Sequence, residues 1–270
     1  MYIRERPQTT TSFSQQLPNK MKLISFIAAF ALFSSTQALC DGDDLKAVTK
    51  CYAAFMASYG LSGSPLPEYE TFNNVRQKWF DENGVKILAN VTKIGATLVS
   101  CLQPQWGCID YLTYLSGMGT TFEDAGEYMA DLYVTQYQCS DRGAQLGLKT
   151  FNCIVQCRES GGQEKQDACE DKLPDDQDWN GQCGEMNDYL KCMGDVYAQC
   201  CGPDAGEYLC DSTRAGIDSM YKECANSSDL LNCTAVYQGS GVRRQEFVKY
   251  MANFAPRSNR VIMKTGEHKN

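Results

Sequence analysis

The chain has 270 residues, a formal net charge of −8, 15 cysteines and a single histidine. Between residues 41 and 240 there are 30 acidic and 14 basic residues, which disfavours nucleic acid and anionic membranes as partners. The histidine, His268, lies in the C-terminal tail. We therefore expect no Ser-His-Asp or Cys-His catalysis and no His-ligated zinc. No nucleotide-binding glycine motif occurs either, so no cofactor is expected.

The N-terminal region predicts a secretory signal peptide over residues 1–38. An apolar run at 23–33 follows Lys20 and Lys22 and precedes small and polar residues at 34–38. The run is too short to cross a bilayer, which needs about 20 residues. An uncleaved anchor is the alternative. We expect a secreted, extracellular protein with no membrane span and no lipid anchor. Met21 offers a second start, so whether residues 1–20 are translated stays open.

The cysteines all lie between Cys40 and Cys233. On the secretory route they are expected to form disulfides rather than metal or redox sites. Cleavage after Ala38 leaves all 15, so one thiol is then free or bonded to another chain. Cleavage after Cys40 leaves 14, which can all pair. The sequence leaves both possibilities open.

Helical periodicity recurs along the chain, and the fold class that we predict is all-α. An N-terminal helical segment, 39–100, contains three amphipathic helices, over 43–60, 68–84 and 88–102. Their apolar stripes must be buried, so the three helices are expected to pack together. Residues 237–270 form a basic tail, which we expect to be partly disordered or to contact the acidic body.

Two segments, 101–160 and 165–236, read as related copies of one helical hairpin. Residues 124–131 and 204–211 agree at six of eight positions, and ordered matches flank both octamers. Asp124 and Asp204 are expected to be helix N-caps. Glu127 and Glu207 then fall at the third helical position, as in a capping box. The whole is predicted to be a disulfide-stapled helical bundle.

The duplication relates most cysteines of one copy to cysteines of the other. It aligns Cys101, Cys108, Cys139 and Cys153 with Cys169, Cys183, Cys224 and Cys233, which allows two internal bridges in each copy. Cys192 and Cys210 occur in the second copy only, at similar distances from the turn at Gly202, so we predict that they bond each other. The remaining cysteines, among which bridges to the N-terminal helices are expected, are Cys40, Cys51, Cys157, Cys200 and Cys201.

Two further chemistries have candidate residues. Glu127 and Glu207 are the named candidates for a hydrolase with paired carboxylates, although capping explains them better. Asp176, Asp178 and Asn180 match the start of a calcium-binding loop, but Asn187 replaces its last glutamate, so a polar loop is the favoured interpretation and no metal is expected. Three sequons place candidate glycans at Asn90, Asn226 and Asn232.

The segment from Cys139 to Cys233 resembles secreted cysteine-rich domains of unknown function that are expanded in nematodes. The resemblance rests on Phe151-Asn152-Cys153, on 188–192, on Cys200-Cys201-Gly202 and on a helix ending in Cys224. It implies an extracellular helical domain without known catalysis. We expect a secreted, non-enzymatic interaction or matrix-type protein that binds an extracellular protein, glycan or lipid. The alternative is a secreted, glycosidase-like hydrolase with paired carboxylates.

Overall fold

A computed structural model describes residues 40–63, 65–174, 181–225 and 227–239. The expected signal peptide, the candidate calcium residues 176–180, Asn226, His268 and the basic tail from residue 240 lie outside the described residues.

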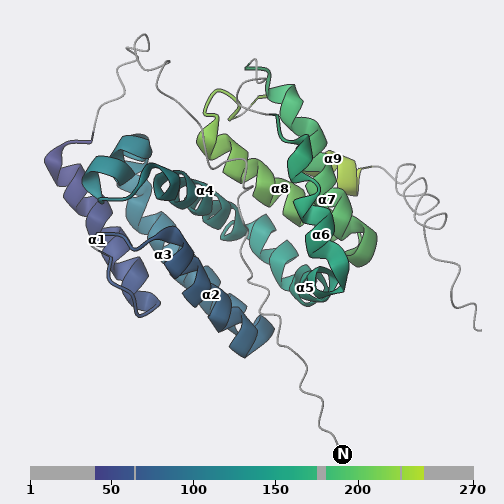
Figure 1. Cartoon of the computed structure of the whole chain (residues 1–270), viewed down its shortest axis with the longest axis horizontal. Coiled ribbons are helices and arrows are strands. Elements are labelled where there is room, and N and C mark those ends of the chain that lie inside the picture. Colours follow the sequence, from purple (N-terminus) through teal and green to yellow (C-terminus); the bar gives the residue numbers. More distant parts are fainter. Residues whose placement is uncertain (1–39, 64, 175–180, 226, 240–270) are drawn as a thin grey trace, which may run out of the picture.

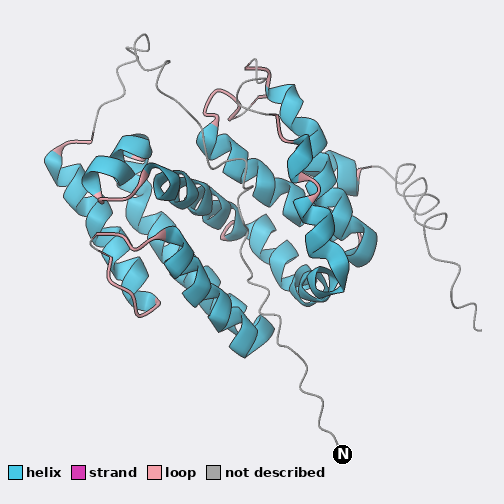
Figure 2. Ribbon diagram, in the orientation of Figure 1, coloured by secondary structure: helices cyan, strands magenta, loops and turns pink. Residues whose placement is uncertain are grey.

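The described residues form helices and no strands, so the predicted all-α class is confirmed (Figure 2). The longer helices are α1 Gly42–Ser58, α2 Tyr69–Asn83, α3 Leu88–Leu102, α4 Phe122–Gln138, α5 Asp141–Cys157, α6 Gln163–Asp167, α7 Asn187–Cys201, α8 Pro203–Met220 and α9 Cys233–Gln238. Short 3₁₀ and π turns connect them: η2 Gly84–Ile87, η3 Gln103–Cys108, η4 Thr113–Gly117, η5 Arg158–Gly162, η6 Glu170–Lys172 and η7 Cys183–Met186. The first three helices agree with the predicted ranges.

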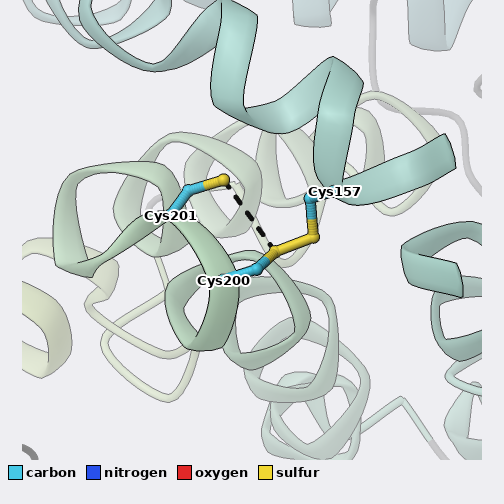
Figure 3. A group of neighbouring side chains, drawn as sticks. All are labelled: Cys157, Cys200 and Cys201. Carbon is cyan, nitrogen blue, oxygen red and sulfur yellow. Dashed lines mark hydrogen bonds between the residues drawn. A yellow bond between two sulfur atoms is a disulfide. The ribbon is translucent and has the colours of Figure 1, made fainter. Parts of the chain in front are cut away.

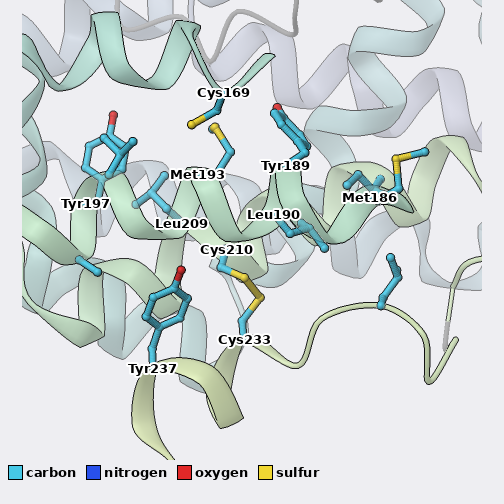
Figure 4. Close-up of a cluster of buried hydrophobic side chains, with 14 of the residues drawn as sticks. Cys169, Met186, Tyr189, Leu190, Met193, Tyr197, Leu209, Cys210, Cys233 and Tyr237 are labelled. Carbon is cyan, nitrogen blue, oxygen red and sulfur yellow. A yellow bond between two sulfur atoms is a disulfide. The ribbon is translucent and has the colours of Figure 1, made fainter. Parts of the chain in front are cut away.

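The helices form two lobes, each with its own apolar core (Figure 1). The N-terminal lobe contains α1 to α4 around an aromatic core, in which the hydroxyls of Tyr52 and Tyr114 lie 2.6 Å apart. The C-terminal lobe contains α5 to α9, and its core surrounds Tyr189, Leu190 and Tyr197 of α7 (Figure 4). Helices α4 and α8 pack against each other and join the lobes.

Helix α1 begins and ends where the sequence predicts. The carboxylate of Asp41 accepts hydrogen bonds from the backbone N–H groups of Asp43, at 2.8 Å, and Asp44, at 2.9 Å. An acceptor at this position satisfies N–H groups that have no partner inside the helix. Gly60, with φ of +75°, follows the end of the helix, in a backbone conformation that favours glycine.

The predicted caps of α4 and α8 are wrong. Thr121 caps α4, and its hydroxyl exchanges hydrogen bonds with Asp124, which stands at the third helical position. Helix α8 begins at Pro203 after Gly202, so Asp204 is its second residue. Each helix therefore starts before the octamer, because a hydroxyl or a proline at the first turn favours the earlier start.

The glycines of the two octamers have the same structural role. A Cβ atom at Gly126 would lie 2.9 Å from the hydroxyl oxygen of Tyr111. A Cβ atom at Gly206 would lie 2.6 Å from Cβ of Ala198 in α7 and 2.8 Å from a ring carbon of Tyr237. In both copies the missing side chain leaves room for a tyrosine.

The final aspartates of the octamers also correspond. Asp131 accepts a hydrogen bond from the hydroxyl of Tyr69 at 3.1 Å, and Asp211 accepts one from the hydroxyl of Tyr137 at 3.4 Å. The hairpins themselves differ: α7 precedes α8 as a full helix, whereas only the π turn η4 precedes α4.

Seven disulfides staple the lobes, and none joins one lobe to the other among the described residues. They are Cys40–Cys108, Cys51–Cys101, Cys153–Cys201, Cys157–Cys200, Cys169–Cys192, Cys183–Cys224 and Cys210–Cys233. The first ties Cys40, just before α1, to η3, the second ties α1 to the end of α3, and the other five lie in the C-terminal lobe. Disulfides in this number suit an extracellular or otherwise oxidising environment.

The predicted bond between Cys192 and Cys210 is wrong. Helices α7 and α8 do form the hairpin, but Cys192 bonds Cys169 and Cys210 bonds Cys233 of α9. Two residues at the same distance from a turn lie at the same level along the paired helices. The direction in which each side chain points depends instead on its position around the helix axis, because one helical turn takes about 3.6 residues. The two cysteines lie at similar heights and bond in different directions.

The expected pattern of two internal bridges per copy is also wrong. The second copy holds three internal bridges, and the first holds none. Its Cys101 and Cys108 bond the N-terminal segment, Cys153 bonds Cys201, and Cys139 is free. The expected ties to the N-terminal helices are confirmed.

The continuous helical run Tyr69–Cys108 includes a window apolar enough to cross a membrane, with a mean hydropathy of 1.4 and 17% of the window buried in the molecule. Helices in the core of a folded lobe can satisfy the same criterion. Cys101 in this run bonds Cys51 of α1, and α3 packs on α1 and α4. The absence of a membrane span stays a prediction.

Candidate functional site: an apolar cavity between the lobes

A cavity of about 120 Å³ lies where the two lobes meet, between α2 and α3 on one side and α5 on the other. Helices α4 and α8 also contribute to its walls. The apolar lining residues are Phe55, Phe80, Leu88, Val91, Val134, Ala144, Leu148, Phe151, Ile154 and Leu209. The cavity is partly open, and Leu148 at its margin is 57% exposed. A concave apolar surface with few polar groups is the usual form of a small-molecule site.

Glycines allow the helices around the cavity to approach closely. A Cβ atom at Gly95 of α3 would lie 2.7 Å from Cγ2 of Thr135 in α4. A Cβ atom at Gly143 of α5 would lie 2.1 Å from the carbonyl oxygen of Tyr137. Both glycines line the cavity, so its walls depend on residues without side chains.

A buried ion pair forms the polar part of the lining. Nη2 of Arg76 in α2 lies 2.7 Å from Oδ1 of Asp131 in α4, and the two side chains are 18% and 9% exposed. The guanidinium also lies over the ring of Phe72, 4.8 Å from its centroid. Burial alone lowers the pKa of Arg76, but the attraction of Asp131 and Tyr69 outweighs burial and raises it. Arg76 therefore remains charged within an apolar surround.

Cys139 is the free cysteine among the described residues, and it also lines the cavity. Its Sγ lies 3.3 Å from the carbonyl oxygen of Thr92, to which it donates. Burial raises the pKa of Cys139 to about 11, so the group is a thiol and not a reactive thiolate at neutral pH. The odd number of cysteines predicts, in a chain that retains Cys40, one thiol that is free or bonded to another chain, but it does not identify which one.

The two glutamates named from the sequence do not line the cavity. Glu207 is fully buried in α8, and both of its carboxylate oxygens accept from Arg142, at 2.8 and 2.7 Å. The hydroxyl of Thr234 in α9 donates to the same carboxylate at 3.0 Å. Glu207 therefore joins three helices, which corrects the capping role predicted for it. Glu127 is the sixth residue of α4, beyond the first turn of the helix.

A second acid lies one turn from Glu207. Burial raises the pKa of Asp211 to about 6, and the negative charge of Glu207 adds to the shift. Neither Asp211 nor Glu207 borders the cavity, where Asp131 is the single carboxylate among the described lining residues. The cavity therefore does not present a carboxylate pair.

The sulfur atoms of Cys157, Cys200 and Cys201 gather between α5 and α7 (Figure 3). Sγ of Cys201 lies 3.8 Å from Sγ of Cys200. Such a group has the spacing of a metal site, but all three sulfurs are already bonded in disulfides. The sequence-based preference for structural disulfides at these positions is confirmed.

Two described sequons differ in their surroundings. Asn90 is exposed on α3. Asn232 is exposed as well and not shielded by its neighbouring disulfide; its side chain caps α9 by accepting from the N–H of Ala235 at 2.9 Å.

Comparison with family models, with curated proteins and with solved structures gave no significant match. The resemblance to nematode cysteine-rich domains therefore stays an expectation.

Proposed function

We propose that the protein is a secreted, non-enzymatic binding protein that holds a small apolar molecule in the cavity between its lobes. The observation that carries the proposal is the cavity of about 120 Å³ with mainly apolar walls. Of the partner classes expected from the sequence, which are protein, glycan and lipid-like molecules, an apolar ligand fits these walls best. The disulfides support the secreted location.

The size of the cavity indicates the size of the ligand. An engineered apolar cavity of about 150 Å³ binds benzene. The cavity here is comparable, so its occupant is a single ring or a short branched alkyl group. Burial of about 150–200 Å² of apolar surface is worth about 4–5 kcal/mol. This free energy corresponds to a Kd of about 0.2–1 mM for a minimal ring probe.

The hydrolase alternative gains no support from this site. A glycosidase requires two carboxyl groups about 5–9 Å apart beside its substrate. Asp131 is the one carboxylate among the described cavity residues, and Arg76 is paired with it. Glu207 is buried, and its carboxylate accepts hydrogen bonds from Arg142 and Thr234.

Glycosylation remains part of the proposal. Asn90 is exposed and has a free surface for a glycan, whereas Asn232 is exposed but serves as the cap of α9. We propose Asn90 as the preferred acceptor of the two.

The binding function is tested by calorimetric titration with α-methylstyrene, a compact apolar ring compound. Ala144 of α5 is half-buried in the cavity wall, and Ala144→Phe is designed to fill the space. Ala96→Phe, on the exposed side of α3, is the matched control. We expect saturable binding to the wild type and to Ala96→Phe, with at least tenfold weaker binding to Ala144→Phe. Absence of binding to the wild type, or equal binding to all three proteins, contradicts the proposal.

A further inference from the structure

The cavity has a polar end at which hydrogen-bond donors lack acceptors. Tyr59, the residue that follows α1 as its C-cap, lines the cavity and is 5% exposed. Its ring is held by Phe55, Phe72 and Trp79, at centroid distances of 5.0–5.3 Å. Its hydroxyl has no hydrogen-bond partner among the described residues. Burial raises the pKa of Tyr59 to about 12, so the hydroxyl keeps its proton at neutral pH.

Arg76 adds donors to the same end. Its contacts to Tyr69, Asn73 and Asp131 all involve one nitrogen, Nη2. Nε and Nη1 have no acceptor in the described part of the chain, and neither is sealed from the cavity. Arg76 and Tyr59 both pack on the ring of Phe72, at 4.8 Å from Cζ of Arg76 and 5.3 Å from the ring of Tyr59, and both line the cavity. Donors without a protein acceptor that reach the cavity can bond an acceptor on a ligand, and a hydrogen bond to a charged donor is among the stronger ones.

The charge at this end selects the kind of acceptor. Asp131 lies 2.7 Å from Arg76 and neutralises it. A ligand carboxylate would therefore face Asp131 as well as Arg76, and it would be desolvated on entry. An uncharged carbonyl oxygen accepts from Tyr59 and Arg76 without this repulsion.

We propose that the natural ligand is an uncharged molecule with a ring-sized apolar body and a carbonyl oxygen, which accepts hydrogen bonds from Tyr59 and Arg76. The inference rests on the proposed binding function and names the ligand class of that site. Apolar walls hold the body of the ligand, and the two donors fix its orientation, which is the usual division of work in small-molecule sites.

Three probes of one shape test the ligand class by calorimetric titration. Acetophenone carries a neutral carbonyl, α-methylstyrene replaces that oxygen with a CH₂ group, and benzoate carries a negative charge. We expect acetophenone to bind the wild type and benzoate to bind at least tenfold more weakly. Binding of benzoate as tight as that of acetophenone overturns the argument from charge.

Two variants separate the hydrogen bond from the apolar walls. Tyr59→Phe removes a hydroxyl that has no protein partner, so the variant is expected to fold with unchanged or higher stability. It should weaken acetophenone about fivefold, as expected for one hydrogen bond, and leave α-methylstyrene unchanged. Asp131→Asn keeps the shape of the side chain but leaves the charge of Arg76 uncompensated, so benzoate should gain at least tenfold.

The outcomes distinguish the two proposals. If no probe binds the wild type, the binding function fails. If α-methylstyrene and acetophenone both bind but Tyr59→Phe weakens neither, the binding function stands and the carbonyl inference fails. If benzoate gains nothing in Asp131→Asn, the role given to Asp131 in excluding anions is wrong.

Discussion

The Arg142–Glu207 pair gives the clearest prediction for stability, because its two side chains are buried to different extents. The carboxylate of Glu207 is fully buried, whereas the side chain of Arg142 is 49% exposed. Replacing Arg142 by Ala leaves a sealed charge without its bidentate partner, which costs about 3–5 kcal/mol. Replacing Glu207 by Gln leaves an arginine that water can reach, and the amide oxygen still accepts from Thr234. We expect this change to cost about 1–2 kcal/mol.

The assay is urea unfolding of the oxidised proteins, with a double-mutant cycle. The double variant Arg142→Ala/Glu207→Gln should be nearly as stable as Glu207→Gln alone, because the sealed charge is absent in both. Lys46→Ala provides the control, since the Lys46–Asp43 pair is 79% and 90% exposed. An exposed pair contributes about 0–1 kcal/mol. The reasoning is refuted if Arg142→Ala costs no more than Lys46→Ala or less than Glu207→Gln.

Three further predictions follow from single contacts. The pKa of Asp211, raised to about 6, lies above its value near 3.8 in an unfolded chain. The native state then binds more protons, so this residue's contribution to stability is lost as pH rises from about 4 to 6. Asp211→Asn should therefore raise the free energy of unfolding at pH 7.5 by about 1–2 kcal/mol and leave it unchanged at pH 4. Thermal melts at the two pH values test this, and a lower stability of the variant at pH 7.5 contradicts the expected direction of the effect. The Cys40–Cys108 bond requires a chain that retains Cys40. If the proposed signal peptide is removed, N-terminal sequencing of the processed chain should therefore place the cleavage before Cys40, whereas a start at Asp41 contradicts the bond. Cys139 should be the one cysteine alkylated by maleimide without reductant, slowly in the folded protein and faster in urea; rapid labelling of the native state contradicts its burial and raised pKa.

Local patterns in the sequence predict the helices but not the assembly around the site. The apolar stripes at 43–60, 68–84 and 88–102 became α1, α2 and α3, because short-range periodicity and capping residues determine where helices form. Disulfide partners and ion pairs depend on how helices rotate about their axes and cross. Cys192 and Cys210 illustrate this for disulfides, because each bonds a partner other than the predicted one. Glu207 illustrates it for ion pairs, because its pairing with Arg142 was not predicted from the sequence.

The cavity is beyond sequence reasoning for the same physical reason. Its walls come from both lobes, and the close approach of α3 and α4 depends on Gly95, which reads in the sequence as one more small residue of an apolar stripe. In the sequence, Tyr59 looks like the last core residue of the first helix; in the structure it is buried and follows the helix as its C-cap. Only the folded structure shows that its hydroxyl lacks a partner among the described residues and lies beside Arg76 and the cavity.

The proposed function requires that the space between α3 and α5 is an accessible apolar cavity. Crystals of the oxidised protein pressurised with xenon test it directly, because xenon enters apolar cavities that water leaves dry. We predict one anomalous peak bordered by Gly95, Phe151 and Leu209, and no such peak in Ala144→Phe. Side chains filling this space in the wild type, or a site without xenon, would contradict the account.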